Sequence, residues 1–307
     1  MAPEAAVRHL AALARLGVPA AGIHVGGGEP FGDFERLLAI VRAARTAGLG
    51  GIGYVETNGF WADSDQTVRS RLAALAEAGM MQISIGADPY HQEFIPPGRI
   101  RLLQTTARDL LGPQRIRARR WKWLEAPQDL SATAEEDRRR LFAGFLKKYP
   151  ERMSGRAAEE LADLAGRSAV EEIPDDGCRE AILAAGHVHI DPDGWVYPGT
   201  CAGIVLGRAT ADLALDELVG RWRPDRSPLV AMLIEGGPRR LLAEAEARGF
   251  HRDPRGYAGK CHLCWAARAH LVRAGAGGDE LQPPSLYAVR AGGVRTPRTR
   301  IAEVKHP

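Results

Sequence analysis

The sequence lacks a strong net charge and any long uninterrupted apolar run. Its 307 residues carry 41 Lys and Arg against 38 Asp and Glu, for a formal net charge of +3. This value is too small to indicate nucleic acid or an anionic membrane as a partner. No apolar stretch approaches the roughly 20 residues that span a bilayer, and Arg8, His9 and Arg15 interrupt the first amphipathic segment, unlike a secretory signal. We therefore expect a cytoplasmic protein with neither a nucleic-acid nor a membrane partner.

Cysteine is scarce, and its absence from the first half is informative. The chain has four cysteines, all in its second half: Cys178, Cys201, Cys261 and Cys264. The last two form a C-x-x-C pair. In a reducing compartment this pattern favours ligation of a metal or cluster over disulfide bonding.

What the first half does contain is a repeating unit. The composition, 45% hydrophobic and 26% charged, is that of an ordinary soluble protein with a packed core. Four glycines each follow a helical run, as expected of a left-handed C′ residue: Gly17, Gly48, Gly79 and Gly112. They are 31 to 33 residues apart, which is the length of one β/α unit.

Each of these glycines is followed by an expected strand. The strands are predicted at 21–25, 51–55, 81–85 and 115–121, and the helices between them carry apolar stripes such as Val68, Leu72 and Leu75. Successive units of this kind form a parallel sheet, either open or closed into a (β/α) barrel. In both arrangements ligands bind beyond the carboxyl ends of the strands.

The residues after the first three predicted strands are rich in glycine and polar side chains. They lie at 26–30, 56–59 and 86–91, and we call them the strand-end loops. Each loop alone has the composition of an ordinary turn. The first has no G-K-[ST] ending and does not match G-x-G-x-x-G. Its Glu29 would repel a phosphate but suits a cationic group such as an ammonium.

These loops resemble a known family. The segments "GGGEPF" (26–31), "ETNGFW" (56–61) and "ISIGADPYHQEFIP" (83–96) are similar to those of the radical S-adenosylmethionine (radical SAM) superfamily. The resemblance covers roughly residues 4–125 and continues more weakly to about 270. It implies a partial (β/α)6 barrel with SAM lying across the strand ends.

The resemblance also implies which residues bind SAM. Gly27, Gly28 and Glu29 would hold its amino group, Ser84 and Asp88 would lie at the ribose, and Arg119 or Arg120 would meet the carboxylate. The implied set is Gly27, Gly28, Glu29, Pro30, Asn58, Ser84, Asp88 and Arg119. Tyr90 and His91 are candidates for the substrate side or are ordinary loop residues. The basic segment 115–121 is equally typical of a solvated face.

One part of the family pattern is missing. The family reaction needs a C-x-x-x-C-x-x-C loop, whose 4Fe–4S cluster cleaves SAM to a 5′-deoxyadenosyl radical that abstracts hydrogen from a substrate. It also implies an electron donor such as flavodoxin or ferredoxin. No cysteine precedes Cys178, and the chain begins at the helix that would follow this loop. We interpret this as truncation of a longer enzyme, and the chain as written is not expected to generate the radical.

The second half has a different pattern. Segments 187–190 and 195–197 flank the turn sequence Asp-Pro-Asp-Gly, which predicts a β-hairpin with Cys201 close behind it. Cys261 and Cys264 lie at the start of a predicted helix. Four thiolates close either a tetrahedral zinc site or a 4Fe–4S cluster.

This cysteine order resembles the SPASM or Twitch auxiliary-cluster domain of radical SAM enzymes. The match is loose, because six residues separate Gly194 from Cys201 and Cys178 lies well upstream. The resemblance implies an auxiliary 4Fe–4S cluster on Cys178, Cys201, Cys261 and Cys264. Two alternatives stay open: a zinc site in which His262 or His251 replaces a cysteine, and ordinary buried thiols.

Together these observations predict an α/β protein. Residues 1–170 would form an incomplete radical SAM-type (β/α)6 barrel without its first strand, and 171–273 a small cysteine-rich α+β domain. Residues 274–307 would be a poorly ordered tail rich in Gly, Pro and Arg. The expected function is that of a radical SAM iron-sulfur enzyme acting on a peptide or small molecule. The alternative is a non-catalytic scaffold with structural zinc.

Overall fold

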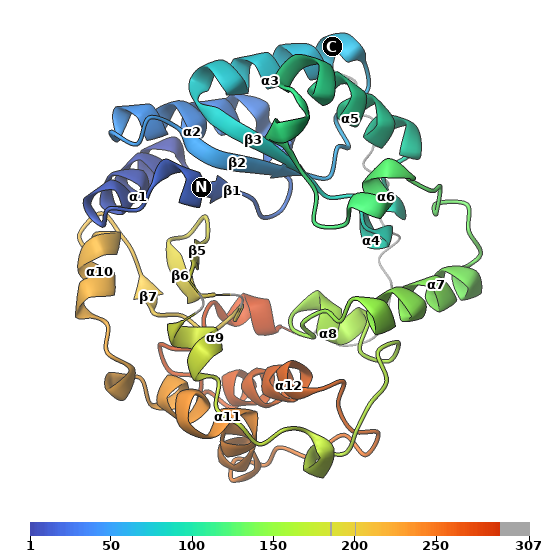
Figure 1. Ribbon diagram of the computed structural model, residues 1–307. Coiled ribbons are helices and arrows are strands. Elements are labelled where there is room, and N and C mark those ends of the chain that lie inside the picture. The colour runs from blue at the N-terminus through green and yellow to red at the C-terminus, as the bar shows by residue number, and fades with distance from the viewer. Residues whose placement is uncertain (185, 200, 289–307) are drawn as a thin grey trace.

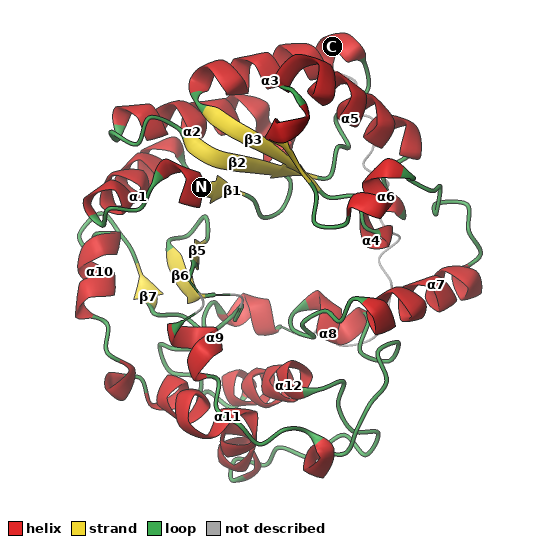
Figure 2. Ribbon diagram, viewed as in Figure 1, coloured by secondary structure: helices red, strands yellow, loops and turns green. Residues whose placement is uncertain are grey.

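The structure is a computed structural model, which describes residues 1–184, 186–199 and 201–288 (Figure 1). It is an α/β protein with one parallel sheet and one small antiparallel sheet (Figure 2). In the described part of the chain, no helix has the length and apolar character needed to cross a membrane.

The parallel sheet lies in the N-terminal half. Its strand order is β1-β2-β3-β4, and every neighbouring pair is parallel. The strands are β1 (His24–Val25), β2 (Ile52–Thr57), β3 (Met80–Ile85) and β4 (Ile116–Arg117). The helices of this half are α1 (Pro3–Arg15), α2 (Phe34–Thr46), α3 (Asp65–Ala78), α4 (Pro89–Gln92), α5 (Pro97–Leu111) and α6 (Trp121–Glu125), with 3-10 turns η1 (Ala20–Gly22), η2 (Pro30–Asp33) and η3 (Pro113–Arg115).

The predicted glycine pattern is confirmed by the backbone. Gly17, Gly48, Gly79 and Gly112 all have positive φ, and Gly79 is the left-handed cap of α3. The apolar stripes are also confirmed, because Val68, Leu72 and Leu75 are fully buried in the core beneath the sheet. The capping glycine ends each helix and the stripe fixes the face that it buries.

Two glycines, one directly before β2 and one within it, allow its close packing. A Cβ on Gly51 would lie 2.2 Å from the Gly79 carbonyl oxygen, and one on Gly53 would lie 2.3 Å from the Ala21 carbonyl oxygen. No side chain fits at either position, so the strand can approach the neighbouring chain segments only because both residues are glycine.

The predicted strand at 115–121 is wrong in its extent. β4 ends at Arg117, and α6 begins at Trp121. Beyond the strand, Arg119 and Arg120 both pair with Glu151, at 2.8 and 3.1 Å, instead of extending the sheet.

The C-terminal half holds the antiparallel sheet and the longest helix. The predicted hairpin is confirmed as β5 (Val188–Ile190) and β6 (Trp195–Pro198), to which β7 (Gly207–Arg208) adds. The helices are α7 (Glu135–Lys148), α8 (Arg156–Glu160), α9 (Arg179–Leu183), α10 (Leu215–Arg221), α11 (Pro228–Glu246) and α12 (Lys260–Arg273), with η4 (Val170–Glu172), η5 (Pro224–Arg226) and η6 (Pro284–Tyr287).

The expectation of a poorly ordered tail is wrong for residues 274–288. Tyr287 is 1% exposed and stacks on Trp265, with ring centroids 4.8 Å apart. The Glu280 carboxylate accepts hydrogen bonds from the backbone N–H groups of Leu229 and Val230, at the start of α11. These contacts offset the cost of ordering a Gly-rich segment. Residues 289–307 lie outside the described residues.

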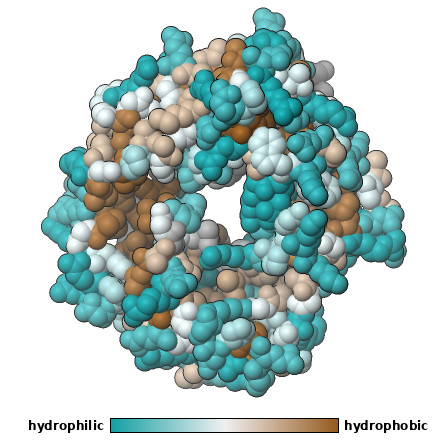
Figure 3. All heavy atoms as spheres, in the orientation of Figure 1, coloured by the Kyte–Doolittle hydropathy of each residue, from teal (hydrophilic) through white to brown (hydrophobic). Residues whose placement is uncertain are grey.

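The two halves face each other across a central opening, visible in Figures 1 and 3. On one side of the opening, α1 packs against the C-terminal half. Its Ala12 is fully buried in a small core shared with Val196, Leu215 and Leu218. Arg15 adds a two-pronged ion pair to Asp216, at 2.7 and 2.8 Å. On the other side α7 and α8 connect the halves (Figure 1).

Candidate functional site

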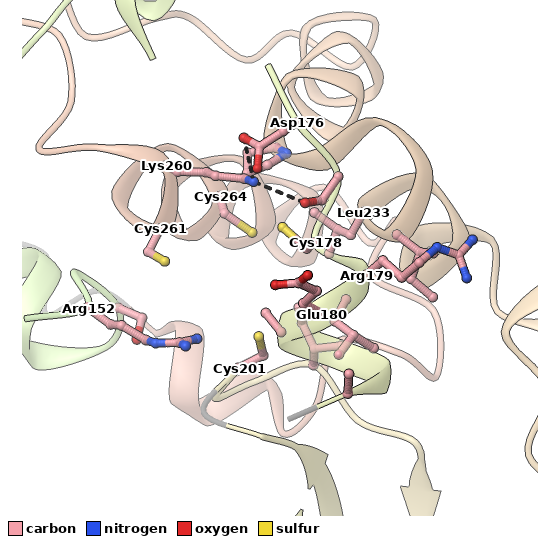
Figure 4. Close-up of a pocket in the computed structure, with 18 of the residues that line it drawn as sticks. Arg152, Asp176, Cys178, Arg179, Glu180, Cys201, Leu233, Lys260, Cys261 and Cys264 are labelled. Atoms are coloured by element: carbon pink, nitrogen blue, oxygen red, sulfur yellow. Dashed lines mark hydrogen bonds and ion pairs between the residues drawn. The ribbon is translucent and has the colours of Figure 1, made fainter. Parts of the chain in front are cut away.

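All four cysteines line one cavity of about 1020 Å³ in the C-terminal half. Cys178 precedes α9, Cys201 follows β6, and Cys261 and Cys264 lie in the first turn of α12. All are free thiols, and Figure 4 shows their sulfur atoms around a common space that the Glu180 carboxylate also enters. The fold therefore gathers thiols that are up to 86 residues apart in sequence (178 to 264). We call this the four-cysteine cavity.

Cys178 is held by a break in α11. Gly237 has φ +61° and is followed by Pro238, so the helix is not continuous there. The Cys178 N–H donates to the Leu233 carbonyl at 2.7 Å. Gly177 packs so closely that a Cβ there would lie 2.3 Å from the Ile234 carbonyl oxygen. The segment before α9 is thus fixed against the first part of α11.

The C-x-x-C pair is held by the start of α12. Gly259, with φ +90°, turns the chain into this helix, and residues three apart lie on the same helical face. Lys260 fastens the turn to the Cys178 segment, because its Nζ pairs with Asp176 at 2.8 Å and donates to the Gly177 carbonyl at 3.1 Å. These contacts bring the two cysteine-bearing segments to one cavity wall (Figure 4).

Three of the cavity thiols, those of Cys178, Cys201 and Cys261, have raised pKa values. Burial raises the pKa of Cys178 to about 11, against the opposing charge of Lys260. Burial and the Cys264 thiolate also raise the pKa values of Cys201 and Cys261. Without a bound cation these groups stay protonated at neutral pH. A metal centre would displace their protons and hold the thiolates together.

A buried cation forms part of the same wall. Arg268 is 2% exposed and lines the cavity. Burial alone would lower its pKa, yet the charges of Cys264, Tyr287 and Cys201 raise it overall. In the described chain its Nε has no hydrogen-bond partner. A buried guanidinium is costly unless an opposite charge compensates it, so this wall of the cavity favours an anionic group.

The spacing of the ligands bears on what fits. Among the described residues, no group of three or more His, Cys, Asp or Glu side chains is close enough to hold a single metal ion. A single zinc ion, with Zn–S bonds of about 2.3 Å, would draw its thiolates to within about 4 Å of one another. The four thiols line one common space (Figure 4).

The two histidines weighed for zinc lie elsewhere. His262 Nδ1 accepts a hydrogen bond from the Ala258 N–H at 3.0 Å. Its side chain lines a separate cavity of about 210 Å³, and neither it nor His251 is among the residues that line the four-cysteine cavity.

Glu29 joins two of the strand-end loops. Its carboxylate accepts hydrogen bonds from the Phe31 N–H, from the Thr57 hydroxyl at 2.8 Å and from the Asn58 N–H at 2.7 Å. Burial raises its pKa, and these hydrogen bonds oppose the rise. The preceding Gly27 and Gly28 have positive φ and open space where a side chain would be. The loop therefore presents exposed backbone beside a carboxylate that is held in place.

Asp88 organises the third strand-end loop. It caps α4 by accepting hydrogen bonds from Tyr90 and His91 N–H groups, and its Oδ1 lies 2.7 Å from His91 Nδ1. Asn58 has a comparable local role, because its side-chain oxygen accepts from the Phe60 N–H. Both predicted SAM residues thus shape their own loops, which leaves their role in SAM binding a prediction.

The predicted residue Ser84 lies beside polar residues of the sheet that the sequence reasoning gave no role. Ser84 lies opposite Glu56 in β2 and opposite Arg117 in β4. The Arg117 guanidinium stacks over Tyr54, 4.0 Å from the ring centroid. Arg119, which was predicted to meet the SAM carboxylate, lies beyond the strand and pairs with Glu151. Alternation along a two-residue strand would have selected Arg117, had the strand end been known.

Histidines connect this sheet with the four-cysteine cavity. His187 lines the cavity, and its ring centroid lies 5.1 Å from that of His189. The His189 ring is 6.0 Å from His24 of β1, which stacks on Tyr54 at 4.6 Å. The hairpin β5–β6 thus reaches from the cavity to the edge of the parallel sheet.

Comparisons with models of known protein families and with curated proteins find no match to this chain. What the fold and the site define by themselves is an α/β protein with a four-cysteine cavity and a set of loops at the strand ends.

Proposed function

We propose that this chain is an iron-sulfur protein of the radical SAM type. In this proposal Cys178, Cys201, Cys261 and Cys264 hold a 4Fe–4S cluster, and the strand-end loops bind SAM. The observation that carries it is the convergence of all four cysteines on one cavity. When bound, such a cluster supplies one-electron transfer.

The chemistry of the cavity supports a cluster over single thiols. Four soft sulfur donors, a buried guanidinium and a wide space all suit an anionic cluster with four thiolate ligands. Structural zinc on these cysteines is the competing outcome.

The parallel sheet supports the SAM half of the proposal. Helices α2, α3 and α5 cover one face of the sheet, and polar side chains lie along the other (Figure 1). We propose that the sheet is part of a (β/α) barrel wall, and the helices on one face and polar residues on the other support this. Glu29 keeps further acceptor capacity for the SAM ammonium, because a carboxylate has about four lone-pair sites.

Hydrogen abstraction from a peptide or small-molecule substrate, with electrons from flavodoxin or ferredoxin, is the reaction this class would perform. It needs a second cluster on a C-x-x-x-C-x-x-C loop, which these 307 residues do not contain. The proposal for this chain is therefore cluster binding and SAM binding.

The test removes one ligand. After anaerobic reconstitution with iron and sulfide, Cys261→Ser should hold less iron than the wild type, because a serine hydroxyl is a poor ligand for this soft centre. Ala266→Ser, on the same helix but away from the cavity, should hold the wild-type amount. Equal iron in the wild type and Cys261→Ser would show that the pair is not a ligand.

A further inference from the structure

Arg268 is placed by the same helix that carries the C-x-x-C pair. It follows Cys264 by four residues on α12, so the two side chains lie on one helical face. It is 2% exposed and lines the four-cysteine cavity. Its position in the wall is thus set by the backbone that sets Cys264.

The guanidinium is held by neutral groups. Its Nη1 donates to the Ala202 carbonyl at 2.8 Å and to the Tyr287 hydroxyl at 2.7 Å. The Tyr287 hydroxyl in turn donates to the Gly203 carbonyl at 2.6 Å. The guanidinium also lies 5.3 Å from the Trp265 ring and 5.5 Å from the Tyr287 ring. These contacts orient Arg268 but bring no negative charge to it.

Its charge lacks a carboxylate within the described chain. The ion pairs of these residues include none to Arg268, although nearby Lys260 is paired with Asp176. The Arg268 Nε is buried without a hydrogen-bond partner in the same set of residues. A buried charge is retained only when an opposite charge or strong acceptor compensates it. Two cysteines of the cavity lie beside it: Cys264 is one helical turn before it on α12, and Cys201 is next to Ala202, whose carbonyl it contacts.

We propose that Arg268 is the fixed counter-charge of the cluster that the four cysteines hold. Its guanidinium faces the Cys264 thiolate, offsets the negative charge of the loaded site and makes reduction of the cluster easier. The inference rests on the proposed function. Arg268 is a positioning and tuning residue, because it would act on the cluster without ligating iron.

The electron balance gives the direction of the effect. Reduction adds one electron, supplied in the experiment by dithionite, and takes the cluster with its four thiolates from two negative charges to three. No proton transfer is required. A fixed positive charge in a low-dielectric wall stabilises the more negative state. Removing that charge lowers the reduction potential.

The first experiment compares variants of the reconstituted chain by EPR-monitored redox titration. Arg268→Gln removes the charge but keeps an amide donor for Ala202 and Tyr287, and its midpoint potential should be more negative than that of the wild type. Arg268→Lys keeps the charge and should shift less. The matched control is Arg239→Gln, which loses bonds to the carbonyls of Val170, Glu171 and Ile173 away from the cavity and should not shift at all.

Equal potentials for the wild type and Arg268→Gln would overturn the inference, as would a shift in Arg268→Lys as large as in Arg268→Gln. If Arg268→Gln does not fold, a measurement on the wild-type chain tests the inference instead. Labelling with ¹⁵N-arginine should give a weak ¹⁵N coupling to the reduced cluster in pulsed EPR. This coupling should persist in Arg152→Lys and in Arg179→Lys, which alter the two exposed arginines that line the cavity. Absence of the coupling would overturn the inference.

Failure of the proposed function can be distinguished from failure of this inference. In that case the wild-type chain itself would bind no four-iron cluster, and metal analysis would show this before any variant is titrated.

Discussion

At the scale of single residues, Glu29 has a structural role in addition to its proposed role in ligand binding. Its two carboxylate oxygens receive three hydrogen bonds from Phe31, Thr57 and Asn58. Thr57 also accepts from the Trp61 indole N–H at 2.9 Å. The carboxylate therefore ties the loop after β1 to the loop after β2, and its loss should affect both the fold and the ligand.

Glu29→Gln should lower the free energy of unfolding by about 1–3 kcal/mol, because the new amide group faces backbone donors in place of an acceptor. Urea unfolding measures this, and the exposed Glu35→Gln on α2 is the control. Glu29→Lys should also weaken SAM binding in calorimetry. If a folded Glu29→Lys protein binds SAM as the wild type does, Glu29 does not hold the SAM ammonium.

The His91–Asp88 pair gives the strand-end loops a pH dependence. Burial lowers the pKa of His91, but the hydrogen bond and charge of Asp88 raise it above its ordinary 6.5 overall. Burial raises the pKa of Asp88, but His91 lowers it below 3.8 overall. The histidine contribution is complete below 6.5 and is lost as pH rises through its folded pKa. The aspartate contribution is complete above 3.8 and is lost as pH falls through its own.

The stability difference between wild type and His91→Gln should therefore be largest between about pH 4 and 6.5. It should stay under about 1 kcal/mol, because the imidazole is 39% exposed. Urea unfolding at several pH values measures it, and in an Asp88→Asn background the difference should become independent of pH. A difference that is constant from pH 5 to 9 in the wild-type background would contradict this assignment.

At the scale of elements, the break in α11 forms one wall of the four-cysteine cavity. The helix carries Leu233 and Ile234, whose carbonyls meet Cys178 and Gly177. Gly237 approaches the same segment, because a Cβ on it would lie 2.1 Å from the Asp176 carbonyl oxygen. Backbone packs on backbone here, and only glycine permits it.

Gly177→Ala should therefore push Cys178 away from α11. We expect a loss of about 1–3 kcal/mol in stability and less iron retained after reconstitution. Gly220→Ala is the control, since nothing lies within 4 Å of a Cβ at this position in α10 and it should keep the iron of the wild type. Full iron in Gly177→Ala would show that Cys178 is not a ligand.

Elements with a local signal were predictable from sequence, whereas those set by distant contacts were not. Capping glycines and apolar stripes located the helices, and Asp-Pro-Asp-Gly located the hairpin. β4 ends at Arg117 although the alternating pattern continues to Trp121, and the local sequence does not show that Arg119 pairs with Glu151, more than thirty residues away. Tyr287 was assigned to a tail because Gly and Pro surround it, yet its ring is buried against Trp265.

At the scale of the whole molecule, the sequence predicted the four cysteines as ligands but not the cavity in which they lie together. Cys178 reaches the others through the broken helix α11 and the Lys260 contacts, and neither follows from spacing alone. Nothing in the sequence distinguishes Arg268 from an ordinary exposed helical arginine, yet its side chain is buried in the cavity wall. The hairpin and α1 then hold this half against the parallel sheet around the central opening (Figure 3).

The central claim is that this assembled cavity holds a 4Fe–4S cluster. The most direct measurement is anaerobic reconstitution of the chain with iron and sulfide, followed by iron and zinc analysis with visible and EPR spectra. The account predicts about four irons per chain, the broad visible absorption of a 4Fe–4S cluster and an EPR signal on reduction. One zinc per chain with no iron would contradict it, and would make the cavity a structural zinc site.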